Sequence, residues 1–220
     1  MYPLYDHQKK IIEADSKWIG LWLGTGGGKT RTLLEMAEGE TLVIVPKQQK
    51  LDKTWHNNLQ RFQIQGVSLH VISKEEFRRD RETLQRYDTV IIDEAHNHFG
   101  VLPDTRQLKG KEIPKTSQLF EATKQYIEKT NPDRFYMCSA TPASKPMNVW
   151  AIATLFGQKW SFYKFRERYY IQRKVGFRSI WLPRGTNVLK EELAGLVKKT
   201  GYVGRLQDWF DVPEQTHITK

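Results

Sequence analysis

Five short apolar runs alternate with longer, more polar stretches along the first two thirds of the chain. Each run is rich in β-branched or aromatic side chains, which is typical of a strand buried on both faces of a sheet. The runs lie at residues 18–23, 41–45, 69–72, 89–92 and 135–138. The stretches between them have helical character and lie at residues 30–38, 49–62, 74–86 and 117–129. This alternation predicts an α/β fold in which helices flank a mostly parallel central sheet with right-handed crossovers.

The remaining segments do not follow that alternation. Residues 98–115 carry Gly and Pro among charged side chains, which predicts a surface loop. Residues 147–156 have the pattern of an amphipathic helix and residues 188–199 predict another, whereas the residues after them resemble a tail or linker. We therefore expect one domain over residues 1–157 and a helical extension with a linker over residues 158–220.

The segment after the first predicted strand has the composition of a phosphate-binding loop. It consists of Gly24, Thr25, Gly26, Gly27, Gly28, Lys29 and Thr30, and helical residues follow. In the order strand, glycine loop, helix, the backbone N–H groups and the helix N-terminus can face phosphate oxygens. Lys29 would then bridge the β- and γ-phosphates of ATP, and the Thr30 hydroxyl would hold Mg²⁺. Leu23 departs from the strict pattern, which has glycine there, and a flexible glycine turn is the alternative.

Two adjacent acids, Asp93 and Glu94, end the fourth predicted strand, and His96 follows them. Carboxylates at the carboxyl end of such a strand lie in the crevice where open α/β sheets bind ligands. Asp93 would coordinate Mg²⁺, directly or through water, and Glu94 would orient and deprotonate the attacking water. His96 would sense the γ-phosphate side or connect to a neighbouring strand. The alternative is an acid-rich helix start, although the apolar strand directly before the acids disfavours it.

Ser139 and Thr141 follow the last predicted strand, so their hydroxyls should emerge at the same edge of the sheet. They could form hydrogen bonds with the acidic motif and couple the nucleotide state to a second site. Without that context, Ser-Ala-Thr-Pro is only a turn signal.

These three motifs, in this order, resemble the amino-terminal RecA-like domain of superfamily two helicases and translocases. The resemblance is to DEAH-signature members related to Swi/Snf-type remodelling ATPases and phage helicases, and it spans roughly residues 4–170. It implies a RecA-like P-loop domain over residues 1–157 with ATP and Mg²⁺ as cofactors, in which Leu23 to Thr30 form the nucleotide loop. It also implies a second RecA-like domain that supplies an arginine finger.

That second domain finds no counterpart after residue 170, where no further phosphate-facing strand and helix fit. Asp211, Val212 and Pro213 resemble the approach to it. We therefore expect this chain to be part of a longer protein.

Weaker matches fall where the same family would place them. Gln8 lies in a segment similar to the family's glutamine motif and would recognise the adenine. The pairs Pro46–Lys47 and Ser73–Lys74 follow the second and third predicted strands, where the family contacts nucleic acid. Ordinary loop and helix packing is the alternative for each pair.

The charge of the chain favours a polyanionic partner. Lys and Arg total 35 against 25 Asp and Glu, a formal net charge of +10. Residues 159–184 hold eight Lys or Arg and one acid, interleaved with aromatic side chains. This composition suits phosphate neutralisation and base stacking, and a helical extension with inward aromatics and solvated cations is the alternative.

Three functions remain open from the sequence. The first is an ATP-dependent DNA helicase or double-stranded DNA translocase, the second an RNA helicase of the same superfamily, and the third a non-catalytic, nucleotide-gated nucleic-acid-binding module. Lys29 and Glu94 together argue against the third.

The single cysteine, Cys138, lies in an apolar run and is expected to be a buried thiol in a reducing compartment. No stretch approaches the roughly 20 apolar residues that cross a bilayer, so no membrane partner is expected. An intracellular place in the cytoplasm or nucleoid is expected, and a phage-encoded origin in a bacterial host stays open.

Overall fold

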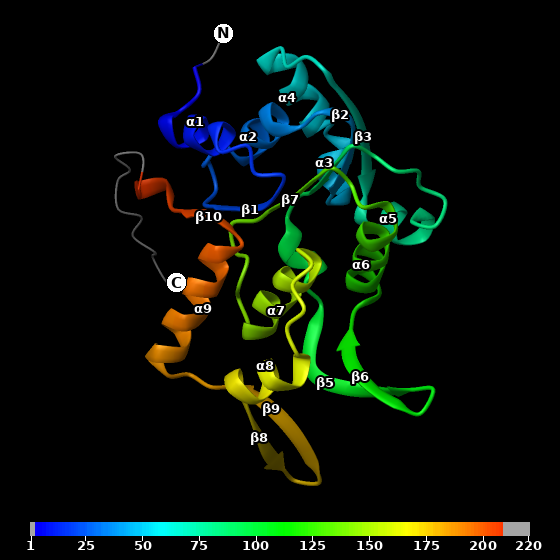
Figure 1. Ribbon diagram of the computed structural model, residues 1–220, viewed down its shortest axis with the longest axis vertical. Coiled ribbons are helices and arrows are strands. Elements are labelled where there is room, and N and C mark those ends of the chain that lie inside the picture. The colour runs from blue at the N-terminus through cyan, green and yellow to red at the C-terminus, as the bar shows by residue number, and fades with distance from the viewer. Residues whose placement is uncertain (1–2, 209–220) are drawn as a thin grey trace, which may run out of the picture.

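A six-stranded sheet forms the middle layer of the computed structural model, which describes residues 3–208 (Figure 1). Its strands are β1 (Trp18–Leu23), β2 (Gly39–Val45), β3 (Val67–Ser73), β4 (Thr89–Ile92), β7 (Arg134–Cys138) and β10 (Gly201–Gly204). Their order across the sheet is β10-β1-β7-β4-β2-β3, and every neighbouring pair is parallel. All five predicted runs form strands of this sheet, which confirms the predicted α/β class.

Helices cover both faces of the sheet. They are α1 (Asp6–Glu13), α2 (Lys29–Met36), α3 (Lys47–Leu51), α4 (Thr54–Phe62), α5 (Lys74–Asp80), α6 (Gln118–Thr130), α7 (Pro146–Leu155), α8 (Phe162–Tyr169) and α9 (Asn187–Lys199). Short 3-10 turns span Ala95–His98 and Leu206–Asp208. Core residues of α1, α2 and α4 form one cluster with the sheet, and those of α5 to α9 form the other.

Strand β4 shows why the central runs are apolar throughout. Ile91 packs into the cluster on the α2 side, and Val90 and Ile92 pack into the cluster on the α6 side. Strand β3 differs because it lies at the edge, and its exposure alternates, with Ser68 and His70 exposed. The expectation that every run is buried on both faces is therefore wrong for β3.

The segment predicted as a surface loop is instead mostly a hairpin. Strands β5 (Val101–Leu108) and β6 (Lys111–Thr116) pair antiparallel. The turn residues Lys109 and Gly110 both have positive φ, 50° and 75°, which suits the right-handed twist of a two-residue hairpin turn. Apart from the buried Val101, the side chains of these strands are exposed or half-buried and form no apolar run, so their pattern did not predict them.

Helix α7 is buried on nearly every side and is not the amphipathic helix that the sequence suggested. It is buried because α6, α8 and α9 all pack against it. The predicted helix at residues 188–199 is confirmed as α9.

The extension is only partly helical. Strands β8 (Tyr170–Val175) and β9 (Arg178–Pro183) form an antiparallel hairpin. The segment expected to begin a linker instead contributes β10 to the edge of the central sheet, beside β1. Residues 211–213 lie outside the described part of the chain, and the domain boundary after residue 157 stays a prediction.

Within residues 3–208, none of the helices combines the length and the apolar character that a bilayer crossing needs.

Candidate nucleotide-binding site

Three sequence motifs meet at one edge of the sheet. Strand β7 lies between β1 and β4, with Leu21 opposite Cys138 and Ile92 opposite Met137. Because the strands are parallel, the loops after all three begin at the same edge. Adjacent strands lie about 4.8 Å apart, so the ends of β1 and β4 are separated by roughly 10 Å. The glycine loop and the acidic motif therefore flank the loop that begins at Ser139.

The glycine loop ends in a helix start that suits an anion. Gly28 is the N-cap of α2 with a φ of 74°, and Gly26 has a φ of 81°. A Cβ at position 28 would lie 2.5 Å from Nε2 of Gln8, so both the backbone and the space require glycine. No side chain caps α2 and its first turn holds no acid. Its first N–H groups can therefore point at a phosphate.

Lys29 lies over this loop. Its Nζ donates to the carbonyl oxygens of Leu23, at 2.9 Å, and Gly24, at 3.1 Å. These contacts hold the ammonium beside the glycine loop, which is the place the phosphate interpretation requires.

Helix α1 holds the loop from the other side. Gln8 is 1% exposed; its Oε1 accepts from the Tyr5 N–H, and its Nε2 donates to Gly28 O and Thr32 Oγ1. His7 Nε2 lies 3.2 Å from Gly27 O. The structure thus shows Gln8 positioning the loop, and its contact with an adenine stays a prediction.

Asp93 has its carboxylate fixed by three donors. Oδ1 accepts from the Glu94 N–H at 2.8 Å and from Cys138 Sγ at 3.1 Å, and Oδ2 accepts from Trp55 Nε1 at 3.2 Å. Burial raises the pKa of the Cys138 thiol, and the Asp93 carboxylate raises it further, so the thiol keeps its proton. The predicted burial of Cys138 is confirmed.

The contacts of Trp55 and Cys138 with Asp93 were not predicted from the sequence. Only their positions in the sequence could have indicated these contacts, since Cys138 ends the strand next to β4 and Trp55 lies on the helix after α3.

Glu94 bends the chain directly after β4, with a φ of 47° in the left-handed region. Such a conformation costs on the order of 1–3 kcal/mol in a non-glycine residue. Lys74 stabilises it, because its Nζ donates to the Glu94 carbonyl oxygen at 3.1 Å. Burial lowers the pKa of Lys74, while the charges of Asp93 and Glu94 oppose that shift.

This placement corrects two expected nucleic-acid contacts. Ser73 is 4% exposed and caps α5 by accepting from the Glu76 N–H, and Lys74 is 8% exposed and faces the acidic motif. Both side chains point inward because α5 starts directly after β3. Pro46 is the N-cap of α3, and Lys47 is the first residue of that helix and is exposed, so their contact with nucleic acid stays a prediction.

His96 joins the acidic motif to the loop after β7. Its Nδ1 lies 3.0 Å from Ser139 Oγ and 3.2 Å from Glu94 Oε2. The hydrogen bond expected between the two motifs is therefore present. Thr141 contributes its backbone N–H to Ser139 Oγ, and its side chain is exposed.

This edge carries oxygen donors of the kind that Mg²⁺ takes. In phosphate-transferring sites this ion is usually held by one or two protein oxygens together with phosphate and water. The Thr30 hydroxyl follows the glycine loop and the Asp93 carboxylate ends β4, so they offer that kind of set. Among residues 3–208 there is no group of three or more His, Cys, Asp or Glu that could hold a metal on its own.

Comparison with known proteins bears on the fold. No protein-family model matches this sequence, and no curated protein sequence matches it. Among solved structures, the chain is similar to the Pyrococcus furiosus Hef helicase domain, with a TM-score of 0.53 and 14% identity over 71% of this chain. The chain has a helicase-type RecA-like fold. It spans 37% of the length of that Hef chain.

Proposed function

We propose that this chain is the ATP-binding domain of a nucleic-acid motor of the DEAH-signature class in superfamily two. The observation that supports this most strongly is the strand order. The loop that leads to Lys29 follows β1, the pair Asp93–Glu94 follows β4, and only β7 lies between these two strands. A phosphate loop alone would support only nucleotide binding.

The residues at this edge can share the work of hydrolysis. The N–H groups of the glycine loop and the Lys29 ammonium bind the β- and γ-phosphates. Thr30 and Asp93 would hold Mg²⁺, which neutralises phosphate charge when bound. Glu94 orients the attacking water and accepts its proton. His96 lies between Glu94 and Ser139, so a change at Glu94 reaches the loop that leads to α7.

A second RecA-like domain of the same protein would complete the site. An arginine finger is worth about 10³ to 10⁵ in turnover for phosphate-loop enzymes. We therefore expect these 220 residues to bind ATP weakly and hydrolyse it slowly on their own.

DNA is the proposed partner, because the resemblance favours Swi/Snf-type translocases and phage helicases. An RNA helicase is the second candidate, and comparing DNA and RNA as stimulants of hydrolysis separates the two. The Lys29 and Glu94 positions disfavour a module that only binds nucleotide.

The proposal is tested by single-turnover phosphate release from ATP with Glu94→Gln. This change keeps the shape of the side chain but removes the base, so we expect hydrolysis to fall by about 10²- to 10⁴-fold while ATP binding persists. Glu75→Gln, an exposed acid on α5, is the matched control and should hydrolyse as the wild type does. Equal rates for Glu94→Gln and the wild type would exclude the assigned role.

A further inference from the structure

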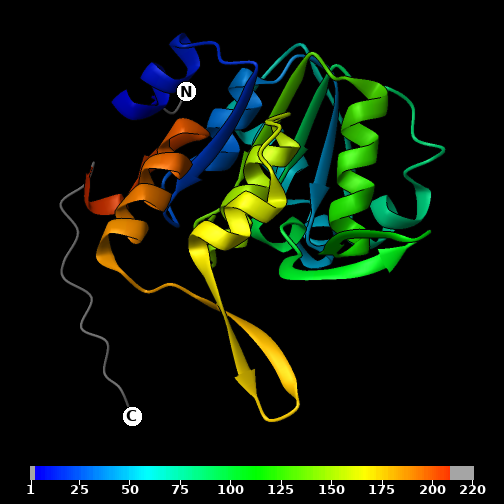
Figure 2. The ribbon, with the colours of Figure 1, turned by 60° about the horizontal axis from the view of Figure 1, so that its bottom comes forward.

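The β8–β9 hairpin lies outside the three layers of the domain. Figure 2 shows it projecting away from the body, beyond the end of α8. Its two strands stay paired from Tyr170 opposite Pro183 to Val175 opposite Arg178. It is therefore a regular ribbon along its whole length.

The base of the hairpin is fixed to the domain. Tyr170 is buried, and its hydroxyl accepts from the Met147 N–H at 3.3 Å. Arg184 Nε donates to the Tyr170 carbonyl oxygen at 3.0 Å, and the Arg166 guanidinium lies 4.3 Å from the centroid of the Trp181 ring. These contacts set the direction in which the hairpin points.

The tip presents an aromatic ring to solvent. Phe177 follows Gly176, whose φ is 59°, and it is fully exposed at 111%. Aliphatic side chains on the strands are exposed between 37% and 59%: Ile171, Val175, Ile180 and Leu182. Exposed apolar groups gathered on one element indicate a binding surface rather than a part of the core.

The charge around these apolar groups favours nucleic acid over protein. From Arg168 to Lys190 the sequence contains six Lys or Arg and no acid. The centres of protein interfaces are depleted of charged residues, whereas single-stranded nucleic acid is bound by cations together with aromatic rings. Arg173 and Lys174 supply exposed cations on the hairpin itself.

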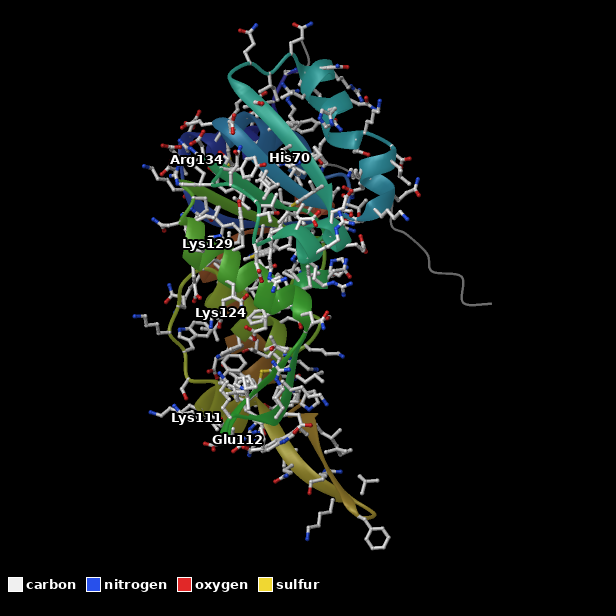
Figure 3. The ribbon with its side chains drawn as sticks, turned by 90° about the vertical axis from the view of Figure 1, so that its right-hand side faces the viewer. His70, Lys111, Glu112, Lys124, Lys129 and Arg134 are labelled. Carbon is white, nitrogen blue, oxygen red and sulfur yellow. The ribbon has the colours of Figure 1, made fainter. Side chains whose placement is uncertain are left out.

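Helix α8, which leads into the β8–β9 hairpin, contacts the hairpin that follows the acidic motif. Strands β5 and β6 form that second hairpin, and Tyr163 of α8 donates its hydroxyl proton to the Glu112 carbonyl oxygen at 2.8 Å. Figure 3 shows the β8–β9 hairpin extending past the level of Lys111 and Glu112. The chain that leaves the acidic motif thus reaches the element that carries the β8–β9 hairpin.

We propose that the β8–β9 hairpin binds single-stranded nucleic acid, with Phe177 stacked on an unpaired base. Arg173 and Lys174, which lie on opposite faces of the ribbon, bind the phosphates on either side of that base. The inference rests on the proposed function in taking nucleic acid as the partner, and it adds the element and the residues that bind it. A fully paired duplex offers a free base face only at its two ends, whereas a single strand offers one at every unstacked base, so the preference is for single strands.

Fluorescence anisotropy with a labelled single strand and the matching blunt duplex tests the stacking contact. Phe177→Ala should weaken single-strand binding roughly 5- to 150-fold and duplex binding much less, because each stacked base contributes about that much. Phe177→Trp keeps an aromatic ring at this position and should bind the single strand with about the wild-type affinity. Leu108→Ala is the control, because it truncates an exposed side chain near the turn of the β5–β6 hairpin. It should leave the affinity for the single strand unchanged.

The salt dependence of binding tests the phosphate contacts. Arg173→Gln with Lys174→Gln should reduce the slope of log affinity against log salt by about 1.4 on a single strand, because each phosphate that a cation neutralises adds about 0.7 to that slope. The control is Lys10→Gln with Lys17→Gln, which removes the same charge from α1 and from the residue before β1, and should reduce the slope less.

Single-strand binding that neither hairpin variant changes would overturn the proposal. Self-association of the wild type that Phe177→Ala abolishes would also overturn it, in favour of a protein partner. Nucleotide binding that depends on Lys29 is measured separately and without nucleic acid. Unchanged single-strand binding by the hairpin variants would thus leave the nucleotide-site assignment intact. Unchanged nucleotide binding by a Lys29 variant would contradict the proposed function itself.

Discussion

At the residue scale, the site depends on how Asp93 is held. A buried carboxylate needs donors for its oxygens, and Trp55 Nε1 supplies the donor to Oδ2. Asp93 is 6% exposed, so water cannot easily replace this contact. Trp55 is thus a positioning residue that acts on the nucleotide site through Asp93.

Trp55→Phe should reveal that role. It removes one donor and leaves Oδ2 buried without it, which costs about 1–3 kcal/mol of stability. We expect the Mg²⁺ concentration needed for ATP binding to rise, as measured by titration of a fluorescent ATP analogue with Mg²⁺. Trp18→Phe is the control, because Trp18 packs edge-on against Phe135 away from Asp93 and should leave the Mg²⁺ titration unchanged. Identical Mg²⁺ titrations for Trp55→Phe and the wild type would show that Trp55 does not position Asp93 for nucleotide binding.

The positions of some residues that follow the strands could be predicted from the sequence, and those of others could not. Lys29, Glu94 and Ser139 were placed at one edge because each follows an apolar run in a parallel sheet. The inward direction of Ser73 and Lys74 depends on where α5 begins and on the bend at Glu94. Neither the start of α5 nor the bend at Glu94 is indicated by a pattern of residues in the sequence.

At the element scale, β10 joins the sheet and supports the phosphate loop. The Gly24 N–H donates to the Gly204 carbonyl oxygen at 3.0 Å, so the first residue of the loop is bonded to β10. Gly201 lies opposite Gly20, and a Cβ there would collide with the Gly20 carbonyl oxygen. The sequence did not predict this strand because its four residues include two glycines and form no apolar run.

A pair of glycine substitutions tests this strand. Gly201→Ala should lower the free energy of unfolding by about 1–3 kcal/mol, because the added methyl pushes β10 away from β1. Gly195→Ala in α9 adds the same methyl where no atom lies within 4 Å, and should raise stability by up to about 1 kcal/mol. Chemical denaturation of both variants measures the two effects. Equal effects of the two substitutions would contradict the packing of β10 against β1.

At the scale of the whole molecule, the fold explains why residues far apart in the sequence act together. Parallel strands place all their carboxyl ends at one edge, and the order β1-β7-β4 sets the glycine loop near the acidic motif. The sequence predicted this layered arrangement because both faces of the central strands are buried. The two hairpins were not predicted because their strands are largely exposed, and their apolar side chains are interrupted by polar and basic ones.

The central claim is that Lys29 and Asp93 act on one nucleotide. Titration of a fluorescent ATP analogue, with Mg²⁺ and with the metal chelated, tests it most directly. Lys29→Ala should weaken binding roughly ten- to hundredfold in both conditions, because the ammonium contacts the phosphates themselves. Asp93→Asn should weaken binding only when Mg²⁺ is present. If neither substitution changes the affinity in either condition, while both variants keep the wild-type melting temperature, the account of this site is wrong.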